Sequence, residues 1–256
     1  MVRTADVTTV QRLCRVGDIP GSDLPEFASR FPVVHRTIRA VRGLQAWDEA
    51  MFRWINRDAS ASWLDSVARL LSGHPAFVPA LVVVGVLLLW RGGPKGLVFV
   101  AMLGLAAGLA NEGIAETLKD GVGRSRPYVV LPEAVLRVGR GNPLGSMPSA
   151  HAMNMALIAT VGAWYYRRVG WVLIVLAAGV GWSRIYNGVH FPCDVGVGFA
   201  LGGGFAALLL WSCEGLWTRW VIPARPGWAK VLPSLLHPPT RWREAKRTDG
   251  PADFRA

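Results

Sequence analysis

The sequence is poor in charged residues and in cysteine. Charged residues occupy 18% of the 256 positions, whereas about 25% is usual for a soluble globular domain. The three cysteines lie far apart, which excludes a disulfide framework and a cysteine-based zinc cluster. Neither a three-residue glycine period nor a long heptad run occurs, so collagen and coiled coils are excluded. The shortage of charge therefore argues against a water-soluble globular protein.

Apolar residues are abundant instead, at 52% of the chain, and they gather into stretches bounded by charges. A membrane-spanning helix needs about 20 mostly apolar residues. The candidate spans are residues 76–90, 96–118, 152–166, 169–183 and 195–213. We therefore predict an all-α fold, a polytopic membrane helix bundle with five transmembrane helices.

Basic residues set the expected orientation of this bundle. The chain has 28 Lys and Arg against 17 Asp and Glu, a formal net charge of +11. Cations lie between the first and second spans, between the third and fourth, and throughout the segment after Glu214. Because cytoplasmic loops carry the excess of Lys and Arg, these segments are predicted to be cytoplasmic. Residues 119–150 and 184–194 then face the outer side of a multi-pass cell-membrane protein.

The regions outside the spans divide the chain into three predicted parts. Residues 1–45 form a loosely ordered N-terminal extension without a recognisable signal peptide. Residues 46–214 form the membrane-embedded domain, and residues 215–256 a loosely ordered basic cytoplasmic tail. Within residues 47–71, charges interrupt the apolar residues every few positions, which favours interfacial helices. A sixth crossing at this segment is the alternative.

Glycine pairs at helical spacing lie within two of the predicted spans. Gly104 and Gly108 form one pair, and Gly198 and Gly202 the other. Small residues at this spacing let helix backbones approach closely in a membrane. We expect both pairs to pack against neighbouring helices.

Polar residues cluster where the predicted spans meet the outer side. The groups are Lys119 to Arg126-Pro127, then Pro148-Ser149-Ala150-His151, then Ser183-Arg184 to His190 and Asp194. Ionisable residues retained near span ends are functional candidates. Two of the three cations are arginines, whose guanidinium groups match phosphate oxygens in pairs. A serine just before a helix adds a hydroxyl and free backbone N–H groups at the positive helix end. The set predicts a site for a phosphate-sized anion, although any one cation is equally consistent with anchoring to lipid headgroups.

The histidines add a chemical function to this anion site. Asp194 follows His190 at a spacing that can place the carboxylate against the imidazole and leave the other ring nitrogen free to attack phosphorus. His151 has no adjacent acid and suits a general acid. No metal is expected, because carboxylates are few and three fixed cations repel a divalent ion.

At these positions the sequence resembles the type 2 phosphatidic acid phosphatase superfamily of integral-membrane lipid phosphatases. The family pattern is Lys, six residues, Arg-Pro; then Pro-Ser-Gly-His; then Ser-Arg, five residues, His, three residues, Asp. All spacings match, and the likeness extends over about residues 45–213. One residue departs from the pattern, Ala150 in place of glycine. We expect Ala150 to lie in the first turn of a helix, where alanine costs little.

The resemblance implies a role for each motif residue. His190 is the expected nucleophile that forms a phosphohistidine, Asp194 its orienting partner, and His151 the acid for the leaving group and later the base for water. The expected phosphate-binding groups are Lys119, Arg126, Ser149, the backbone N–H of Ala150, and Arg184. No cofactor is expected.

Substrate choice is less tightly implied than chemistry. The short chain resembles bacterial members that hydrolyse undecaprenyl diphosphate, the carrier lipid of cell-wall synthesis. Relatives that act on phosphatidylglycerol phosphate, phosphatidate or lipid A phosphates are the alternatives. Arg124, Arg137 and Arg140 are candidates for binding a second phosphate, and are equally consistent with solvated or headgroup-bound side chains.

Two other functional classes remain as hypotheses. Haloperoxidases of the superfamily bind vanadate at the same type of site, but they are soluble, and five spans argue against this class. A non-catalytic lipid-phosphate binding or transport protein would not need both histidines. The expected partners are a lipid phosphate substrate and the bilayer, with no nucleic acid. The sequence implies no particular oligomeric state.

Overall fold

The computed structural model describes residues 32–72 and 77–240, and every regular element within these ranges is helical. This confirms the all-α class for the described residues.

The helices before the bundle are α3 (Pro32–Arg53), the π-helix η1 (Trp54–Asp58) and α4 (Ser62–Leu71). The next are α5 (Phe77–Arg91), α6 (Gly93–Leu109), the π-helix η2 (Ala110–Ala115), α7 (Glu116–Val122) and α8 (Pro127–Val130). The remainder are α9 (Ala150–Tyr165), α10 (Arg167–Tyr186), α11 (Pro192–Leu216), the π-helix η3 (Trp217–Val221), α12 (Ile222–Ala224) and α13 (Pro226–Ala229).

The chain forms two compact units, residues 1–49 and residues 50–256. The predicted division into residues 1–45, 46–214 and 215–256 stays a prediction. The predicted extension falls largely on residues 1–31, which lie outside the described residues.

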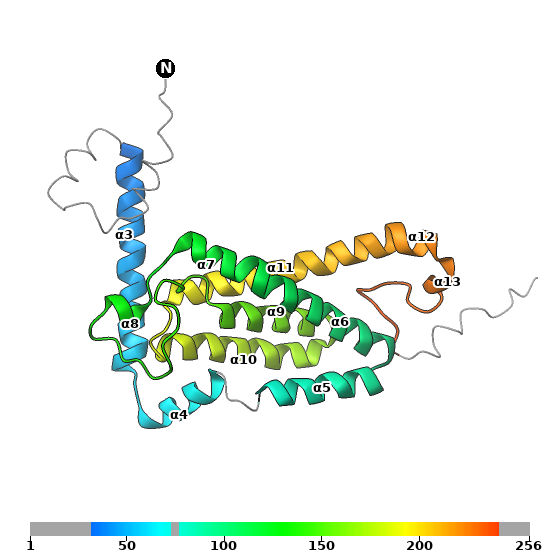
Figure 1. Ribbon diagram of the computed structural model, residues 1–256, viewed down its shortest axis with the longest axis horizontal. Helices are drawn as coiled ribbons and strands as arrows, with labels where there is room; N and C mark the ends of the chain where they lie inside the picture. Colours follow the sequence, from blue (N-terminus) through cyan, green and yellow to red (C-terminus); the bar gives the residue numbers. More distant parts are fainter. Residues whose placement is uncertain (1–31, 73–76, 241–256) are drawn as a thin grey trace, which may run out of the picture. The chain divides into compact units, whose positions relative to one another are not determined.

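Helix α9 is the centre of the second unit. It packs against α10, α11 and α6, and it lies between α10 and α11 in Figure 1. Met153, Leu157 and Val161 of α9 are fully or almost fully buried in one apolar cluster with residues of α6 and α11. Burial of such side chains is worth about 1.5–3 kcal/mol each relative to exposure to water. The helix that carries His151 is thus held on several sides.

The two glycine pairs behave differently. A Cβ atom on Gly198 would lie 2.6 Å from the backbone oxygen of Ser149, and one on Gly202 would overlap the backbone of Met153. This pair therefore allows α11 to touch α9, as predicted. A Cβ atom on Gly104 or Gly108 would meet no atom of another described residue within 4 Å, so the prediction that this pair packs a neighbouring helix is wrong for the described part of the chain. Spacing alone does not decide which helix face receives a partner.

The predicted spans correspond to helices, but their lengths vary. Two helices in the described ranges are long and apolar enough to cross a membrane, Arg167–Tyr186 and Pro192–Ala224. Shorter apolar helices cover Val82–Arg91 and Gly93–Leu109. The number of crossings, including the alternative at residues 47–71, therefore stays a prediction.

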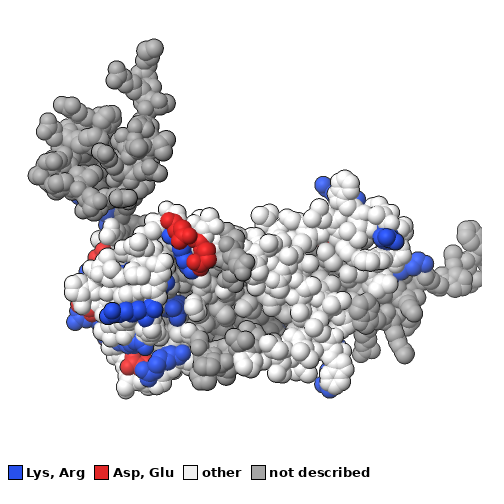
Figure 2. All heavy atoms as spheres, in the orientation of Figure 1, with Lys and Arg blue, Asp and Glu red and all other residues white. Residues whose placement is uncertain are grey.

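The surface of the second unit is apolar along much of its length. On the face shown in Figure 2, charged side chains gather at the two ends of this unit, near α7 and α8 and near α12 and α13, and the described side chains between them form an uncharged band. Large apolar side chains that are more than half exposed include Val83 of α5, Val175 of α10 and Leu208 of α11. Exposed apolar area on this scale is typical of a surface that another apolar phase covers.

The segment after α11 folds back on the bundle. The Glu214 carboxylate accepts hydrogen bonds from the backbone N–H groups of Leu235 and Leu236 at 2.7 and 3.1 Å. The hydroxyl of Tyr165, near the end of α9, donates to the Leu235 carbonyl at 2.8 Å. The expectation of a loosely ordered tail is therefore corrected up to Thr240, and residues 241–256 lie outside the described residues.

Candidate active site

The motif residues lie at or next to five helix ends. They are Lys119 near the end of α7, Arg126 before α8, Ser149, Ala150 and His151 at the start of α9, Arg184 in the last turn of α10, and His190 and Asp194 around the start of α11. All these helix ends lie at the same end of the second unit (Figure 1). The charged motif residues lie at the helix ends because the residues along the middle of these helices are mostly apolar.

Contacts between side chains and backbone join these segments into one cluster. Nη1 of Arg126 lies 3.3 Å from Nε2 of His190. The backbone N–H of Ser149 donates to the carbonyl of Asp194 at 3.1 Å. His151 interacts electrostatically with four members of the set, which are Arg184, His190, Lys119 and Arg126. The structure thus brings together the residues that the motif separates by up to 75 positions (119 to 194).

His190 is held by a backbone carbonyl. Its Nδ1 lies 2.7 Å from the carbonyl oxygen of Ser146, whereas the nearest carboxylate oxygen of Asp194 is 3.7 Å from the same nitrogen. A carbonyl only accepts hydrogen bonds, so Nδ1 carries the hydrogen and Nε2 keeps its lone pair. Burial lowers the pKa of His190, the charge of Arg126 lowers it further, and Asp194 opposes both. The imidazole is therefore neutral near pH 7, as a nucleophile requires.

Asp194 is fully buried and has three hydrogen-bond donors. Nη1 of Arg124 lies 2.6 Å from Oδ1, the Ser146 hydroxyl lies 2.5 Å from Oδ2, and the backbone N–H of Phe191 donates to Oδ2 at 2.8 Å. Such a set satisfies a buried carboxylate without help from the histidine. The short hydrogen bond from His190 that we expected is replaced by the longer separation of 3.7 Å.

Arg126 is buried, and the chain wraps around its guanidinium group. Nε donates to the carbonyl of Asn142 at 2.7 Å, and Nη1 donates to the carbonyl of Val189 at 3.1 Å. A Cβ on Gly141 would lie 3.2 Å from Nη2, so the loop backbone packs closely on the cation. Burial lowers the pKa of Arg126 below its usual range. An anion bound beside the guanidinium would offset this desolvation.

Two donors in the cluster have no acceptor. The hydroxyl of Ser149 and Nε of Arg184 are buried and lack a hydrogen-bond partner among the described residues. Leaving a buried donor unsatisfied costs about 1–3 kcal/mol, and more for a charged group. Both atoms belong to residues predicted to bind phosphate oxygens. Unmet donors of this kind fit a site that an oxyanion fills.

Lys119 and His151 differ in exposure. Nζ of Lys119 pairs with Oε1 of Glu116 at 2.6 Å, and the lysine side chain is 15% exposed. His151 is exposed. Ala150, the departure from the motif, is the first residue of α9, and no described non-glycine residue has a positive φ. Alanine at this position is therefore unstrained, as predicted.

The three additional arginines, Arg124, Arg137 and Arg140, have different surroundings. Arg124 pairs with Asp194. Arg137 binds Asp65 at 2.8 Å, donates to the carbonyls of Asn56 and Tyr186, and lies over the Tyr186 ring at 4.2 Å. Arg137 is therefore a structural cation. Arg140 is exposed.

Comparison with known proteins decides the family. Residues 95–217 match the PAP2 superfamily. The chain is similar to the crystal structure of LpxE from Aquifex aeolicus, with a TM-score of 0.52 and 30% identity over 63% of this chain and 93% of that chain. This chain belongs to the PAP2 superfamily. It is also similar to the crystal structure of a transmembrane PAP2-type phosphatidylglycerolphosphate phosphatase from Bacillus subtilis, with a TM-score of 0.54 and 26% identity over 77% of this chain and 99% of that chain.

Curated relatives match over a shorter part of the chain. The bacitracin transport permease protein BcrC of Bacillus licheniformis is 34% identical over 91 residues, which are 36% of this chain and 44% of that protein. A putative undecaprenyl-diphosphatase, YbjG of Escherichia coli, is 33% identical over 98 residues, which are 33% of this chain and 50% of that protein. The chain thus spans about half the length of these relatives.

The motif-based prediction missed two residues that organise this PAP2 site. Ser146 contacts both His190 and Asp194, and its backbone N–H donates to the carbonyl of Arg124 at 3.0 Å. Asn56 of η1 binds the backbone N–H and carbonyl of Val135 at 2.8 and 2.9 Å, which fixes the loop between α8 and α9. Both residues lie outside the three motifs and contact residues far along the chain, so no spacing in the sequence indicates their roles.

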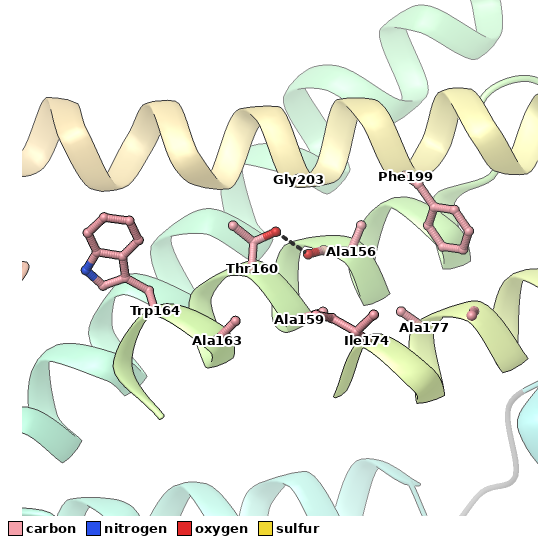
Figure 3. Close-up of a pocket in the computed structure, with 10 residues that line it drawn as sticks. Ala156, Ala159, Thr160, Ala163, Trp164, Ile174, Ala177, Phe199 and Gly203 are labelled. Atoms are coloured by element: carbon pink, nitrogen blue, oxygen red, sulfur yellow. Dashed lines mark hydrogen bonds between the residues drawn. The ribbon is translucent and has the colours of Figure 1, made fainter. Parts of the chain in front are cut away.

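A separate cavity lies away from the PAP2 motif residues. It has a volume of about 590 Å³ and lies between α9, α10 and α11, as Figure 3 shows. Its lining is apolar, and its one hydroxyl, on Thr160, donates to the carbonyl of Ala156 at 2.8 Å. Ala156 and Thr160 follow His151 by five and nine residues, about 140° and 180° around the helix. The cavity therefore opens on a different face of α9 from the histidine.

Within the described ranges, no group of three or more His, Cys, Asp or Glu residues could hold a metal ion. The groups that this chain itself supplies at the candidate site are cations, imidazoles, the Asp194 carboxylate, hydroxyls and backbone N–H donors.

Proposed function

We propose that this protein is a membrane lipid phosphatase that cleaves a phosphate ester or anhydride through a phosphohistidine. The observation that carries the proposal is the convergence of His190 and Arg126 with the unsatisfied donors of Ser149 and Arg184. A neutral imidazole nitrogen beside unsatisfied donors is the arrangement that transfer of a phosphoryl group requires. Membership of the PAP2 superfamily supports a phosphatase hydrolase.

In the first step, Nε2 of His190 attacks phosphorus while the bond from phosphorus to the lipid oxygen breaks. Desolvation and the neighbouring cations lower the pKa of His151 to about 4 in the empty site, and a bound phosphate dianion raises it again by offsetting those cations. The protonated His151 then donates its proton to the departing oxygen, which leaves as the lipid alcohol or, from a diphosphate, as the lipid monophosphate. Arg126, Arg184 and Ser149 bind the equatorial oxygens, where negative charge is spread in the transition state. Lys119 and the backbone N–H of Ala150 complete the proposed phosphate site.

In the second step, water replaces the histidine on phosphorus. His151, now neutral, accepts a proton from the water as its oxygen bonds to phosphorus. The bond from phosphorus to Nε2 breaks, and inorganic phosphate leaves. His190 returns to its neutral form with the hydrogen still on Nδ1, so the site is regenerated without another reactant.

Undecaprenyl diphosphate is the proposed substrate. One relative is named a putative undecaprenyl-diphosphatase, which supports a polyprenyl diphosphate. Phosphatidylglycerol phosphate is the main alternative, supported by the named activity of one structural neighbour, and phosphatidate and lipid A phosphates follow. Arg140 is the proposed cation for the second phosphate of this substrate, because its side chain is exposed and its loop packs against Arg126.

We also propose a multi-pass location in the cell membrane with the site at the outer side. The uncharged band between the charged ends of the second unit supports burial in lipid. The basic residues near α12 and α13 support a cytoplasmic placement of the opposite end.

Phosphoenzyme trapping tests the proposal. Purified protein is incubated with lipid labelled at the terminal phosphate, quenched in alkali and analysed for phosphohistidine. We expect label on the wild type and none on His190→Ala, with turnover reduced at least about 1,000-fold in the variant. Equal turnover in His190→Ala would falsify the nucleophile assignment. Comparing undecaprenyl diphosphate, phosphatidylglycerol phosphate and phosphatidate in the same detergent then ranks the substrates.

A non-catalytic lipid-phosphate binding or transport protein is the second candidate, because one relative is named a transport permease. Such a protein would bind the lipid without releasing phosphate. Binding of labelled lipid with no phosphate release by the wild type would favour this candidate over the phosphatase.

A further inference from the structure

Asp194 makes no short hydrogen bond to His190, the residue that it was expected to orient, because other donors occupy both of its carboxylate oxygens. Its Oδ1 is taken by Arg124 at 2.6 Å, and its Oδ2 by the hydroxyl of Ser146 at 2.5 Å and by a backbone N–H. Ser146 turns its carbonyl to Nδ1 of His190 at 2.7 Å, which is 1.0 Å closer than the 3.7 Å from Nδ1 to Oδ2 of Asp194. One buried serine thus contacts the acid through its side chain and the imidazole through its backbone.

We propose that Arg124 and Ser146 are positioning residues for His190. Arg124 and the Ser146 hydroxyl hold the carboxylate of Asp194 away from the imidazole, and the Ser146 carbonyl orients the ring in its place. The proposal rests on the proposed function, because it concerns how the nucleophile of that reaction is kept ready.

The difference between a carbonyl and a carboxylate matters for a nucleophile. Both accept the Nδ1 hydrogen and so fix the same tautomer. A carboxylate also stabilises the protonated ring, which has no lone pair with which to attack phosphorus. The neutral Ser146 carbonyl orients His190 without this penalty. The guanidinium of Arg124 offsets much of the remaining charge of Asp194.

The carboxylate is still near enough to act after the attack. Phosphorylation at Nε2 leaves the ring as a cation with the hydrogen on Nδ1. Oδ2 of Asp194 lies 3.7 Å from that nitrogen, so it stabilises the phosphohistidine more than the free histidine. An interaction that strengthens as charge develops favours the reaction rather than the resting state.

The charged groups that act on His190 come from several elements. Arg126, before α8, and Arg184, at the end of α10, disfavour its protonation, whereas Asp194 of α11 favours it. His151 of α9 also interacts with it. Freeing Asp194 from its restraints would therefore shift the balance in one direction only, toward the protonated ring.

The experiment compares the pH dependence of kcat/KM for the wild type, Arg124→Gln, Arg124→Lys and Ser146→Ala, on the same lipid phosphate. In Arg124→Gln the carboxylate loses its counter-charge, and the acid limb should move about one pH unit higher. In Ser146→Ala the carboxylate loses the hydroxyl, and the limb should move in the same direction. In both variants kcat should fall about 10-fold or more at pH 7 with little change in KM.

Two variants serve as references. Arg124→Lys keeps the cation, and its acid limb should return close to that of the wild type. Arg53→Gln breaks a pair of similar length between residues outside the motif, 2.7 Å from Nε of Arg53 to Oε1 of Glu133, and should leave the limb unchanged. Thermal unfolding in the same detergent identifies any variant that has lost its fold. If Arg124→Gln has unfolded, Ser146→Ala carries the test, and if Ser146→Ala has unfolded, Arg124→Gln carries it.

The outcomes separate this proposal from the function on which it rests. A wild type that hydrolyses no lipid phosphate overturns the proposed function. An active wild type whose acid limb stays in place in both Arg124→Gln and Ser146→Ala overturns the positioning roles alone. Nitrogen NMR of labelled histidine in the wild type gives a second readout. A His190 ring with its hydrogen on Nε2 would contradict the orientation by Ser146.

Discussion

The two ends of α11 each carry a carboxylate, and the surroundings differ: Asp194 is fully buried, whereas Glu214 is half-buried. Asp194, in the first turn, belongs to the cluster in which the Ser149 hydroxyl and Nε of Arg184 have no acceptor among the described residues. Glu214, near the other end, accepts two backbone N–H groups from residues 235 and 236, which closes the chain onto the bundle. One carboxylate belongs to a cluster with unmet hydrogen-bonding capacity and the other to a completed one.

This difference separates function from stability within a single helix. A cluster with buried unsatisfied donors is costly in the empty protein and gains those contacts only when an anion binds. A completed cluster gains its contacts on folding. Substitutions at the Asp194 end should therefore change catalysis more than stability, and substitutions at the Glu214 end should do the reverse.

The largest effect is expected at the catalytic end, in Arg184→Lys. Lysine keeps the charge but loses the planar pair of donors, including the unsatisfied Nε. We expect kcat to fall about 100- to 1,000-fold, as for loss of a transition-state donor. Steady-state kinetics on the lipid phosphate measure this, with the melting temperature as the control. A near-wild-type rate would mean that Arg184 only anchors α10.

Ser149→Ala should cause a smaller loss at the same end. The change removes one neutral donor, and the buried hydroxyl has no other partner within the described residues. We expect kcat/KM to fall about 10- to 100-fold, the value of one hydrogen bond to a charged group, with unchanged or slightly raised thermal stability. Loss of stability without loss of activity would place the hydroxyl in the folding of the helix start instead.

The wild-type pH profile sharpens the contrast further. Burial lowers the pKa of His190 from its ordinary 6.5, and the neutral ring is the nucleophile. The activity should therefore hold as the pH falls through 6.5, and decline only at lower pH as the ring takes up a proton. The rate of phosphohistidine formation against pH measures this. An acid limb above pH 6.5 would contradict a desolvated nucleophile.

At the other end, Glu214→Gln should affect stability and spare catalysis. The amide cannot accept both N–H groups as strongly as the carboxylate does. We expect a loss of about 1–3 kcal/mol, seen as a lower melting temperature in detergent. The value of kcat/KM below the melting temperature should stay within about twofold, since the site is at the far end of α11. A large fall in kcat with an unchanged melting temperature would break the comparison.

The smallest effect is expected for Tyr165→Phe. The hydroxyl donates one hydrogen bond to the Leu235 carbonyl, and the ring remains packed edge-on against Phe99 at 6.0 Å. We expect a loss of about 1 kcal/mol in stability and none in activity. A change in proteolytic cleavage near residue 235 would report the loosened segment directly.

Much of the site followed from the sequence because its motifs are short and local. The residues Ser149, Ala150 and His151 are contiguous, and the start of α9 at Ala150 was expected from the chemistry of a helix N-terminus. The helical class followed from apolar stretches bounded by charges. The tail after Glu214 was harder, because its order depends on a contact with a carboxylate about 20 residues earlier.

The glycine pairs show where such local arguments end. Both pairs have the same spacing, yet within the described ranges only Gly198 and Gly202 meet another helix. Spacing determines that two residues share a helix face. It does not determine which way that face turns in the bundle.

The sequence by itself determined an apolar helical chain and the set of phosphate-binding and imidazole residues, because these depend on residue type and short spacing. The tertiary structure alone decided the partners within the site. Arg124 is 70 residues from Asp194, and Ser146 is 44 residues from His190. Contacts over such distances depend on how α9, α10 and α11 pack, and a backbone carbonyl, which every residue carries, leaves no mark in the sequence.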